Sequence, residues 1–202
     1  ASGDQPEALP TIELEPPTLS IYIGPNTSPL KGKEGEFTTS RQISDRLHKE
    51  LETNIALKIA QDGLGYKVSG RGELHLSVLI ETMRREGYEL AVSKPEVVTK
   101  RGDNGELLEP VEEVVVSVPD EYSGSVISKL NMRKGMMKQM MSEGNGYSKI
   151  EYSVPTRGLM GYRSEFINDT HGEGTMVRRF EGFETWKGEI PERTNGVAVA
   201  QE

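Results

Sequence analysis

The chain has 202 residues, enough for one large domain or for two domains of about 100 residues each. Hydrophobic residues make up 34% and charged residues 28%, a balance typical of a globular protein with a well-charged surface. The lack of cysteine excludes disulfides, thiolate metal sites and cysteine nucleophiles. The net charge of −8 argues against a general nucleic-acid binder, because phosphate neutralisation requires clustered Lys and Arg.

The N-terminal residues are acidic and proline-rich, which is unlike a basic and then apolar export signal. No apolar stretch approaches the roughly 20 residues that span a bilayer. We therefore expect a cytoplasmic protein with no membrane segment. Residues 1–18 carry four prolines and few large apolar side chains, which favours an extended connector.

The first half of the chain then alternates between strand and helix patterns. Residues 19–23 alternate as a strand does, and Gly24 ends the alternation. Residues 40–53 have apolar side chains four positions apart, which predicts an amphipathic helix with Thr39 or Ser40 as its N-cap. The apolar stripe of this helix is Ile43, Leu47 and Leu51.

Two short strands follow, 55–59 and 66–68, joined by a glycine turn at residues 62–65. A second helix is predicted over residues 72–86, and a closing strand over residues 88–92. The side chains expected to be buried under this second helix are Leu74, Val78, Leu79 and Met83.

The resulting order is strand, helix, strand, strand, helix, strand. This is the ferredoxin-like arrangement, in which two helices cover one face of an antiparallel sheet. We assign it to residues 19–95, and we assign residues 96–110, with a turn at Gly102–Gly105, to a linker.

The same order recurs in residues 111–190, where Pro119-Asp-Glu supplies the chemistry of a helix start. The elements expected here are a strand at 111–118, a helix after 119, strands at 136–141 and 148–154, a helix from 159 to 166 and a strand at 176–180. The sequence therefore predicts an α+β protein of two ferredoxin-like (βαββαβ) units in tandem.

Nucleotide and metal sites find little support in the residues. The chain contains no Gly-x-x-x-x-Gly-Lys-Ser/Thr, the loop that holds β- and γ-phosphates. Histidines His48, His75 and His171 show no metal-ligand spacing, so we expect no metal and no cofactor in this chain. Five of the eight methionines fall between Met132 and Met141, and core packing of one strand is favoured over an adaptable contact surface.

The basic residues cluster locally although the chain is acidic. Between Ser125 and Arg163 there are seven basic residues against two acidic ones, and a solvated face explains this count as well as an anion-binding surface does. The basic residues are Lys129, Arg133, Lys134, Lys138, Lys149, Arg157 and Arg163.

Several long motifs resemble a known family. The segments at 68–80 (VSGRGELHLSVLI) and 83–95 resemble the third domain of the elongation factor G superfamily, and residues 155–174 (from PTRGLMGYRSEF) resemble its fifth domain. Within that superfamily, four segments are similar to the BipA/TypA branch: 26–29 (NTSP), 32–35 (GKEG), 39–43 (TSRQI) and 157–166.

The resemblance implies the ribosome-docking part of a multidomain cytoplasmic GTPase linked to large-subunit assembly and stress adaptation. In such a protein GTP and Mg²⁺ bind to domains that this sequence does not contain, so we expect no catalytic residue here. Residues 1–18 would connect to an upstream β-barrel domain. Residues 191–202 would begin a family-specific C-terminal domain that approaches transfer RNA.

The expected partners are ribosomal RNA, transfer RNA and the protein's own G domain. The residues expected to bind ribosomal RNA are Arg133, Lys134, Lys138, Arg157 and Arg163. The residues expected to face the G domain are Arg71, Glu73 and His75. A small-ligand regulatory module remains the alternative, because tandem ferredoxin-like units can bind amino acids at a sheet edge. A metal carrier on the same fold is excluded by the missing Cys-x-x-Cys ligands.

Overall fold

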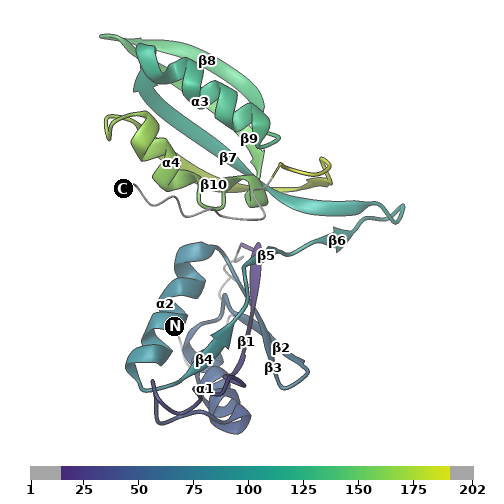
Figure 1. The fold of residues 1–202 in the computed structure, drawn as a ribbon. Coiled ribbons are helices and arrows are strands. Elements are labelled where there is room, and N and C mark those ends of the chain that lie inside the picture. The colour runs from purple at the N-terminus through teal and green to yellow at the C-terminus, as the bar shows by residue number, and fades with distance from the viewer. Residues whose placement is uncertain (1–14, 192–202) are drawn as a thin grey trace, which may run out of the picture. The chain divides into compact units, whose positions relative to one another are not determined.

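The structure is a computed structural model that describes residues 15–191, and it divides into two compact units, Ala1–Pro95 and Glu96–Glu202. Residues 1–14 and 192–202 lie outside the described residues. They hold most of the expected N-terminal connector and nearly all of the expected start of a C-terminal domain. Each unit is an antiparallel sheet with two main helices, so the predicted α+β class is confirmed (Figure 1).

Unit 1 contains six elements in the predicted order. They are β1 (Leu19–Pro25), α1 (Ser40–Thr53), β2 (Lys58–Asp62), β3 (Gly65–Gly70), α2 (Glu73–Arg85) and β4 (Leu90–Val92). The strands are arranged β2-β3-β1-β4, and every pairing between them is antiparallel. The first strand therefore lies between the third and the fourth, as the ferredoxin-like arrangement requires.

Helix α1 begins where its capping residues dictate. The Thr39 hydroxyl accepts a hydrogen bond from the Gln42 backbone N–H, and the Gln42 side chain accepts one from the Thr39 N–H. This reciprocal capping box satisfies two donors that the first turn leaves free. The helix then buries Ile43 and Leu47 against the sheet, as predicted, whereas Leu51 is half-buried.

Helix α2 buries a different face from the one expected. Leu76, Leu79 and Met83 are buried, whereas Leu74 and Val78 are exposed. The prediction was therefore right for Leu79 and Met83 and wrong for the other two. The segment carries two apolar stripes at helical spacing, and only packing against the sheet selects between them.

The strands of the β2–β3 hairpin have other boundaries than expected. Strand β2 begins at Lys58 rather than at Ile55, whose side chain is exposed. The turn between the strands contains Gly63, which adopts a left-handed φ of 56° that glycine permits without a Cβ clash. The predicted turn therefore lies where expected, whereas β2 starts and ends three residues later than predicted and β3 is longer at both ends.

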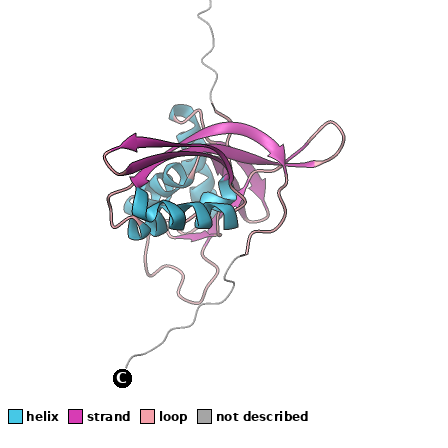
Figure 2. Cartoon of the chain, turned by 90° about the horizontal axis from the view of Figure 1, so that it is seen from above, coloured by secondary structure: helices cyan, strands magenta, loops and turns pink. Residues whose placement is uncertain are grey.

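Unit 2 repeats the arrangement with longer strands. Its elements are β6 (Lys100–Arg101), β7 (Leu107–Pro119), α3 (Asp120–Met132), β8 (Met136–Gly144), β9 (Tyr147–Pro155), the 3₁₀ helix η1 (Thr156–Leu159), α4 (Tyr162–Asp169) and β10 (Thr175–Thr185). The short strand β5 (Glu96–Val97) precedes them in the chain and does not join their sheet. The strand order is β10-β7-β9-β8, and β6 pairs with the start of β7. The helices gather on one side of the long strands (Figure 2).

The core of unit 2 lies between that sheet and its helices. It is formed by Val114, Val116, Val118, Val126, Leu130, Ile150, Tyr152, Val154, Leu159, Tyr162 and Phe166. The predicted helix over 159–166 is in fact two helices, because Gly161 adopts a left-handed φ of 69° between η1 and α4. A left-handed residue cannot continue a right-handed helix, so the chain turns there.

Strand β8 contradicts the expectation that its methionines pack in the core. All nine of its residues are exposed. The strand lies at the end of the β10-β7-β9-β8 order and is bulged against β9 at two places. A strand at the edge of a sheet has little core beneath it, which is why apolar side chains can remain on the surface there.

No helix within residues 15–191 is long and apolar enough to cross a membrane.

Candidate functional site

The five cations expected to bind RNA all lie in unit 2, but the structure gives them different surroundings. Arg157 is internal: its side chain is 9% exposed, and Glu109, its ion-pair partner, is fully buried. The guanidinium donates to both Glu109 oxygens, at 2.5 and 3.1 Å, and to the Gly188 carbonyl at 2.5 Å. It also lies 3.8 Å from the centre of the Trp186 ring. Arg157 is therefore held inside the unit, which corrects its placement on an RNA-contacting surface.

Arg133 is half-buried between the two helices of unit 2. It donates to the Gly158 carbonyl at 2.7 Å and to Glu165 at 2.6 Å, and it lies over the Tyr162 ring at 4.9 Å. The ammonium of Lys129 also contacts Glu165, at 2.8 Å, and this bond with that of Arg133 lowers the pKa of the carboxyl. Arg133 thus joins α3 to α4, and only part of its charge faces solvent.

Lys138 projects from β8 into an ion-pair network on the sheet. It bonds to Glu181 and lies 3.7 Å from Glu113, which Arg179 also contacts at 2.7 Å. The bond to Glu181 raises the pKa of the lysine. Lys138 is therefore partly neutralised by acids of β7 and β10.

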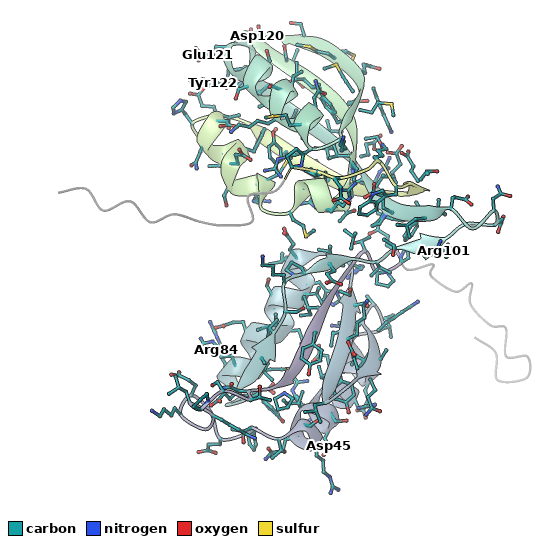
Figure 3. The ribbon with its side chains drawn as sticks, turned by 45° about the vertical axis from the view of Figure 1, so that its right-hand side comes forward. Asp45, Arg84, Arg101, Asp120, Glu121 and Tyr122 are labelled. Carbon is teal, nitrogen blue, oxygen red and sulfur yellow. The ribbon has the colours of Figure 1, made fainter. Side chains whose placement is uncertain are left out.

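Lys134 and Arg163 are the two predicted cations that are exposed and also lack an ion-pair partner among residues 15–191. Lys134 follows α3 in a left-handed conformation with φ of 63°, and Arg163 is the second residue of α4. The opposite end of α3 is acidic, since Asp120 and Glu121 lie at its start (Figure 3). Lys134 therefore provides unpaired positive charge at the C-terminal end of α3.

The local basic excess is smaller in the fold than in the sequence. Lys129 bonds to Asp169 and Glu165, and Arg157 bonds to Glu109. The carboxylates of these pairs, like Glu113 and Glu181, lie outside residues 125–163, the segment in which the basic residues were counted. Tertiary pairing thus leaves two of the five predicted cations unpaired in the described residues rather than a broad basic face.

The residues expected to face a G domain lie at the entry to α2. His75 has a structural role: its Nε2 lies 3.0 Å from Asn54 Oδ1, and its Nδ1 accepts the Arg71 backbone N–H at 3.3 Å. Burial, and then the charge of Arg71, lower the pKa of His75, so the ring is neutral at pH 7. The Arg71 side chain is exposed, and Glu73 is half-buried in the first turn of α2.

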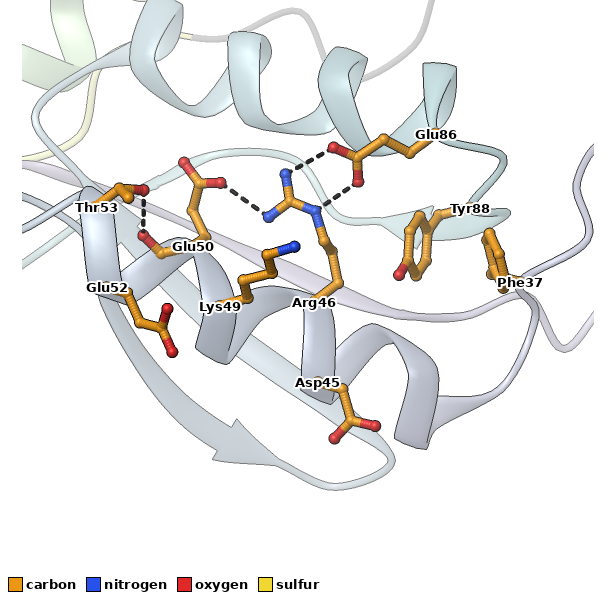
Figure 4. Close-up of a pocket in the computed structure, with 9 residues that line it drawn as sticks. All are labelled: Phe37, Asp45, Arg46, Lys49, Glu50, Glu52, Thr53, Glu86 and Tyr88. Carbon is orange, nitrogen blue, oxygen red and sulfur yellow. Dashed lines mark hydrogen bonds and ion pairs between the residues drawn. The ribbon is translucent and has the colours of Figure 1, made fainter.

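One groove of unit 1 was not anticipated from the sequence. It lies beside α1 and has a volume of about 530 Å³ (Figure 4). Its ends differ: the Phe37 and Tyr88 rings pack with centroids 4.8 Å apart, while Arg46 bonds to Glu86 at 2.5 Å and Glu50 at 2.9 Å. Ion pairs therefore occupy Arg46, Glu50 and Glu86, which are only part of the charged lining of this groove.

A second unanticipated feature is the Glu89 loop, residues 26–36, which the Glu89 carboxylate organises. That carboxylate accepts the backbone N–H groups of Gly32 at 2.9 Å and Glu34 at 3.1 Å, and the Asn26 amide at 2.6 Å. The bond from Glu34, followed by that from Asn26, lowers the pKa of Glu89. A single acid in a predicted strand carried no signal of this role, because its partners lie more than 50 residues earlier.

The residues of the described chain do not assemble a metal centre. No three His, Asp or Glu side chains within residues 15–191 are grouped so that they could hold a metal ion.

The chain is similar to proteins of one family over almost all its length. Residues 106–194 match the family model "Elongation factor G C-terminus". Proteins named "Large ribosomal subunit assembly factor BipA" are 48% identical in Synechocystis (98% of this chain, 34% of that protein) and in Escherichia coli K12 (96% and 32%). The Haemophilus influenzae protein of that name is 46% identical over 96% of this chain and 32% of its own.

A solved structure supports the fold. A crystal structure of a Thermus thermophilus protein matches with a TM-score of 0.52 and 17% identity, covering 92% of this chain and 44% of that one. The chain spans about a third of the length of the curated relatives it matches. On the strength of its near-complete alignment to those relatives, the chain belongs to the BipA family, and residues 106–194 correspond to the elongation factor G C-terminus.

Proposed function

We propose that this chain is the ribosome-docking part of a BipA-type translational GTPase that acts in large-subunit assembly and stress adaptation. The observation that carries the proposal is 46–48% identity over 96–98% of the chain to proteins named as large ribosomal subunit assembly factors. A ribosome partner places the protein in the cytoplasm.

Unit 2 supplies the proposed contact with ribosomal RNA, through Lys134 and Arg163. Both are exposed cations without an ion-pair partner in the described part of the chain, so their charge is available to phosphates. Arg133 and Lys138 contribute less, because each already contacts carboxylates. Phosphate contacts release counterions, so binding should weaken steeply with salt.

The chain contributes no chemistry to GTP. Its sequence has no phosphate loop, so its residues do not fit GTP and Mg²⁺, which the full-length protein would hold elsewhere. Unit 1 would transmit the nucleotide state through the entry to α2. There Arg71 is exposed, and its backbone is fixed by His75 and by Thr18, whose hydroxyl donates to the Arg71 carbonyl at 2.9 Å.

Co-sedimentation with purified bacterial ribosomes tests the docking proposal. The chain and the full-length protein are compared at about 50 and about 200 mM salt, and affinity should fall as a power of the salt concentration. Replacing both Lys134 and Arg163 with Ala should reduce the log–log slope by about 1.4 to 1.8, since each phosphate contact contributes about 0.7 to 0.9.

The matched control removes two exposed arginines of unit 1, Arg84 and Arg85, which pair with Glu81. It loses the same charge and should keep the wild-type slope. An unchanged slope in the Lys134/Arg163 variant would remove these two residues from the contact. If calorimetry detected binding of free amino acids to the chain, and the chain did not bind ribosomes, a small-ligand regulatory module would be favoured instead.

The relay proposal is tested in the full-length protein. Arg71→Ala should reduce ribosome-stimulated GTP hydrolysis by roughly fivefold or more if Arg71 is a central interface contact. Arg84→Ala, on the exposed end of the same helix, should leave hydrolysis unchanged. Equal rates in wild type and the Arg71 variant would contradict the relay.

A further inference from the structure

Five methionines of unit 2 lie close together in the sequence and are exposed, and they are here called the methionine cluster. Its members are Met132, Met136, Met137, Met140 and Met141, and their side chains are between 39% and 60% exposed. Met132 ends α3, and the other four belong to the edge strand β8. Every residue of β8 is exposed, so small molecules in solvent can reach these thioethers.

The other three methionines have different surroundings. Met83 is fully buried in the core of unit 1, and Met176 is partly buried against the core of unit 2. Met160 is half-buried between η1 and α4. The chain has no cysteine, so thioethers are its only sulfur groups, and most of the accessible ones lie in a single segment.

We propose that the methionine cluster is a site at which peroxides selectively form methionine sulfoxide in the folded protein. With hydrogen peroxide, the thioether sulfur attacks one oxygen, the O–O bond breaks as the S–O bond forms, and proton transfer to the leaving oxygen releases water. Sulfur is oxidised by two electrons, and the peroxide is reduced. Thiolates normally compete for such oxidants, but this chain has none.

The fold should tolerate this modification, because of where β8 lies. Its backbone is paired with β9, while its side chains contribute nothing to the core of unit 2. A sulfoxide oxygen on β8 therefore points into water. At Met83 the same oxygen would be buried without a hydrogen-bond partner, which is strongly unfavourable. Oxidation of Met83 therefore requires unit 1 to open first.

Peptide mass spectrometry after graded exposure to hydrogen peroxide tests the proposal. Trypsin cleaves after Arg133, Lys134, Lys138 and Lys149, which places Met136 and Met137 in one peptide and Met140 and Met141 in another. Sulfoxide should form in these peptides at least about tenfold faster than at Met83, since susceptibility follows exposure. The circular dichroism spectrum should stay unchanged at half-conversion of the cluster.

The same reaction in denaturant is the control. In denaturant the rates of sulfoxide formation at the eight methionines should converge to within about twofold, because unfolding exposes all thioethers equally. Met140→Leu with Met141→Leu should abolish oxygen addition to the peptide 139–149 and leave the rate at Met136 unaltered. Equal rates at Met83 and the cluster in the folded chain, or unfolding that parallels oxidation of the cluster, would overturn the proposal.

Discussion

Arg157 shows how a residue chosen for its charge can have a structural role. Its guanidinium is enclosed by the buried Glu109 carboxylate, the Gly188 carbonyl and the Trp186 ring. Glu109 also accepts the Lys187 backbone N–H at 2.8 Å. These contacts hold the segment after β10 against the unit, so Arg157 stabilises unit 2 rather than presenting charge to a partner.

Glu109→Gln should therefore destabilise unit 2. The change leaves the Arg157 charge buried without its counterion, and breaking a buried pair in this way lowers the free energy of unfolding by about 3 to 5 kcal/mol. Lys134→Ala, on the surface, should change it by less than about 0.5 kcal/mol. Urea unfolding followed by the fluorescence of Trp186, the chain's single tryptophan, measures both. Equal stability of the Glu109 variant and wild type would contradict this role.

His75 predicts a pH dependence of stability in unit 1. Burial and the charge of Arg71 lower its pKa in the folded state, so the fold favours the neutral ring. A lowered pKa means that the stabilising contribution is fully present above the unfolded value of about 6.5. It is lost as the pH falls below that value and through the lowered folded pKa.

Urea unfolding of unit 1 at pH 7.5 and at pH values below 6 measures this loss. In His75→Gln the part of this loss of stability that is due to the ring should disappear, because glutamine does not titrate. An NMR titration of the His75 ring gives the folded pKa directly. If the variant lost as much stability between these pH values as the wild type, or if the His75 pKa lay above the ordinary value, another group would be responsible.

At the scale of single elements, the start of α1 is set by local chemistry alone. The Thr39 hydroxyl and the Gln42 side chain cap each other's backbone N–H groups. Thr39→Ala should cost about 1 kcal/mol of unit 1 stability, the usual effect of removing an N-cap side chain. Arg41→Ala, an exposed neighbour in the same turn, serves as the control in thermal unfolding and should have little effect.

The Glu89 loop depends on one carboxylate for its conformation. Glu89→Gln replaces an acceptor oxygen with a donor group, so the amides of Gly32 and Glu34 lose their shared partner. Hydrogen exchange in residues 26–36 should become faster, while the strands of unit 1 remain protected. Glu36→Gln, an exposed acid in the same loop, should leave exchange unchanged. Wild-type protection in the Glu89 variant would contradict the assignment.

Acid should loosen the same loop. The bonds from Glu34 and Asn26 lower the pKa of Glu89, so the ionised carboxylate is the form that the fold favours. The ordering of the loop is then present above the ordinary glutamate pKa, and it is lost as the pH falls through the lowered folded value.

At the scale of the whole molecule, two units each have their own buried core. Leu47 belongs to the core of unit 1, and Leu130 belongs to that of unit 2. Replacing either with Ala removes buried methyl groups and leaves a cavity, which costs about 2 to 5 kcal/mol. The loss should be confined to the unit that contains the substitution.

Hydrogen exchange with peptide resolution shows whether the loss is confined to one unit or extends to both. Leu47→Ala should accelerate exchange in β1 and β3 while β7 and β9 keep their protection, and Leu130→Ala should do the reverse. If either variant accelerated exchange equally in both sheets, the chain would unfold as one cooperative block.

Much of the fold was determined by the sequence alone, because the deciding interactions are local. Helix α1 follows from the apolar spacing of Ile43 and Leu47 and from Thr39, which caps its first turn. The hairpin of β2 and β3 follows from strand patterns around a glycine turn, and the recurring order of elements predicted the ferredoxin-like units. The long motifs at 68–80 and 155–174 pointed to the family that the comparisons show.

The tertiary structure decided which side chains face the core and which charges remain free. Leu74 and Val78 satisfy the same helical spacing as the buried stripe, and β8 has the composition of a core strand although it lies at the edge. Arg157 and Arg163 are chemically alike, yet only Arg157 meets an acid within residues 15–191, supplied by Glu109 from 48 residues earlier. Sheet order and strand register bring such distant residues together, and no local pattern of spacing contains that information.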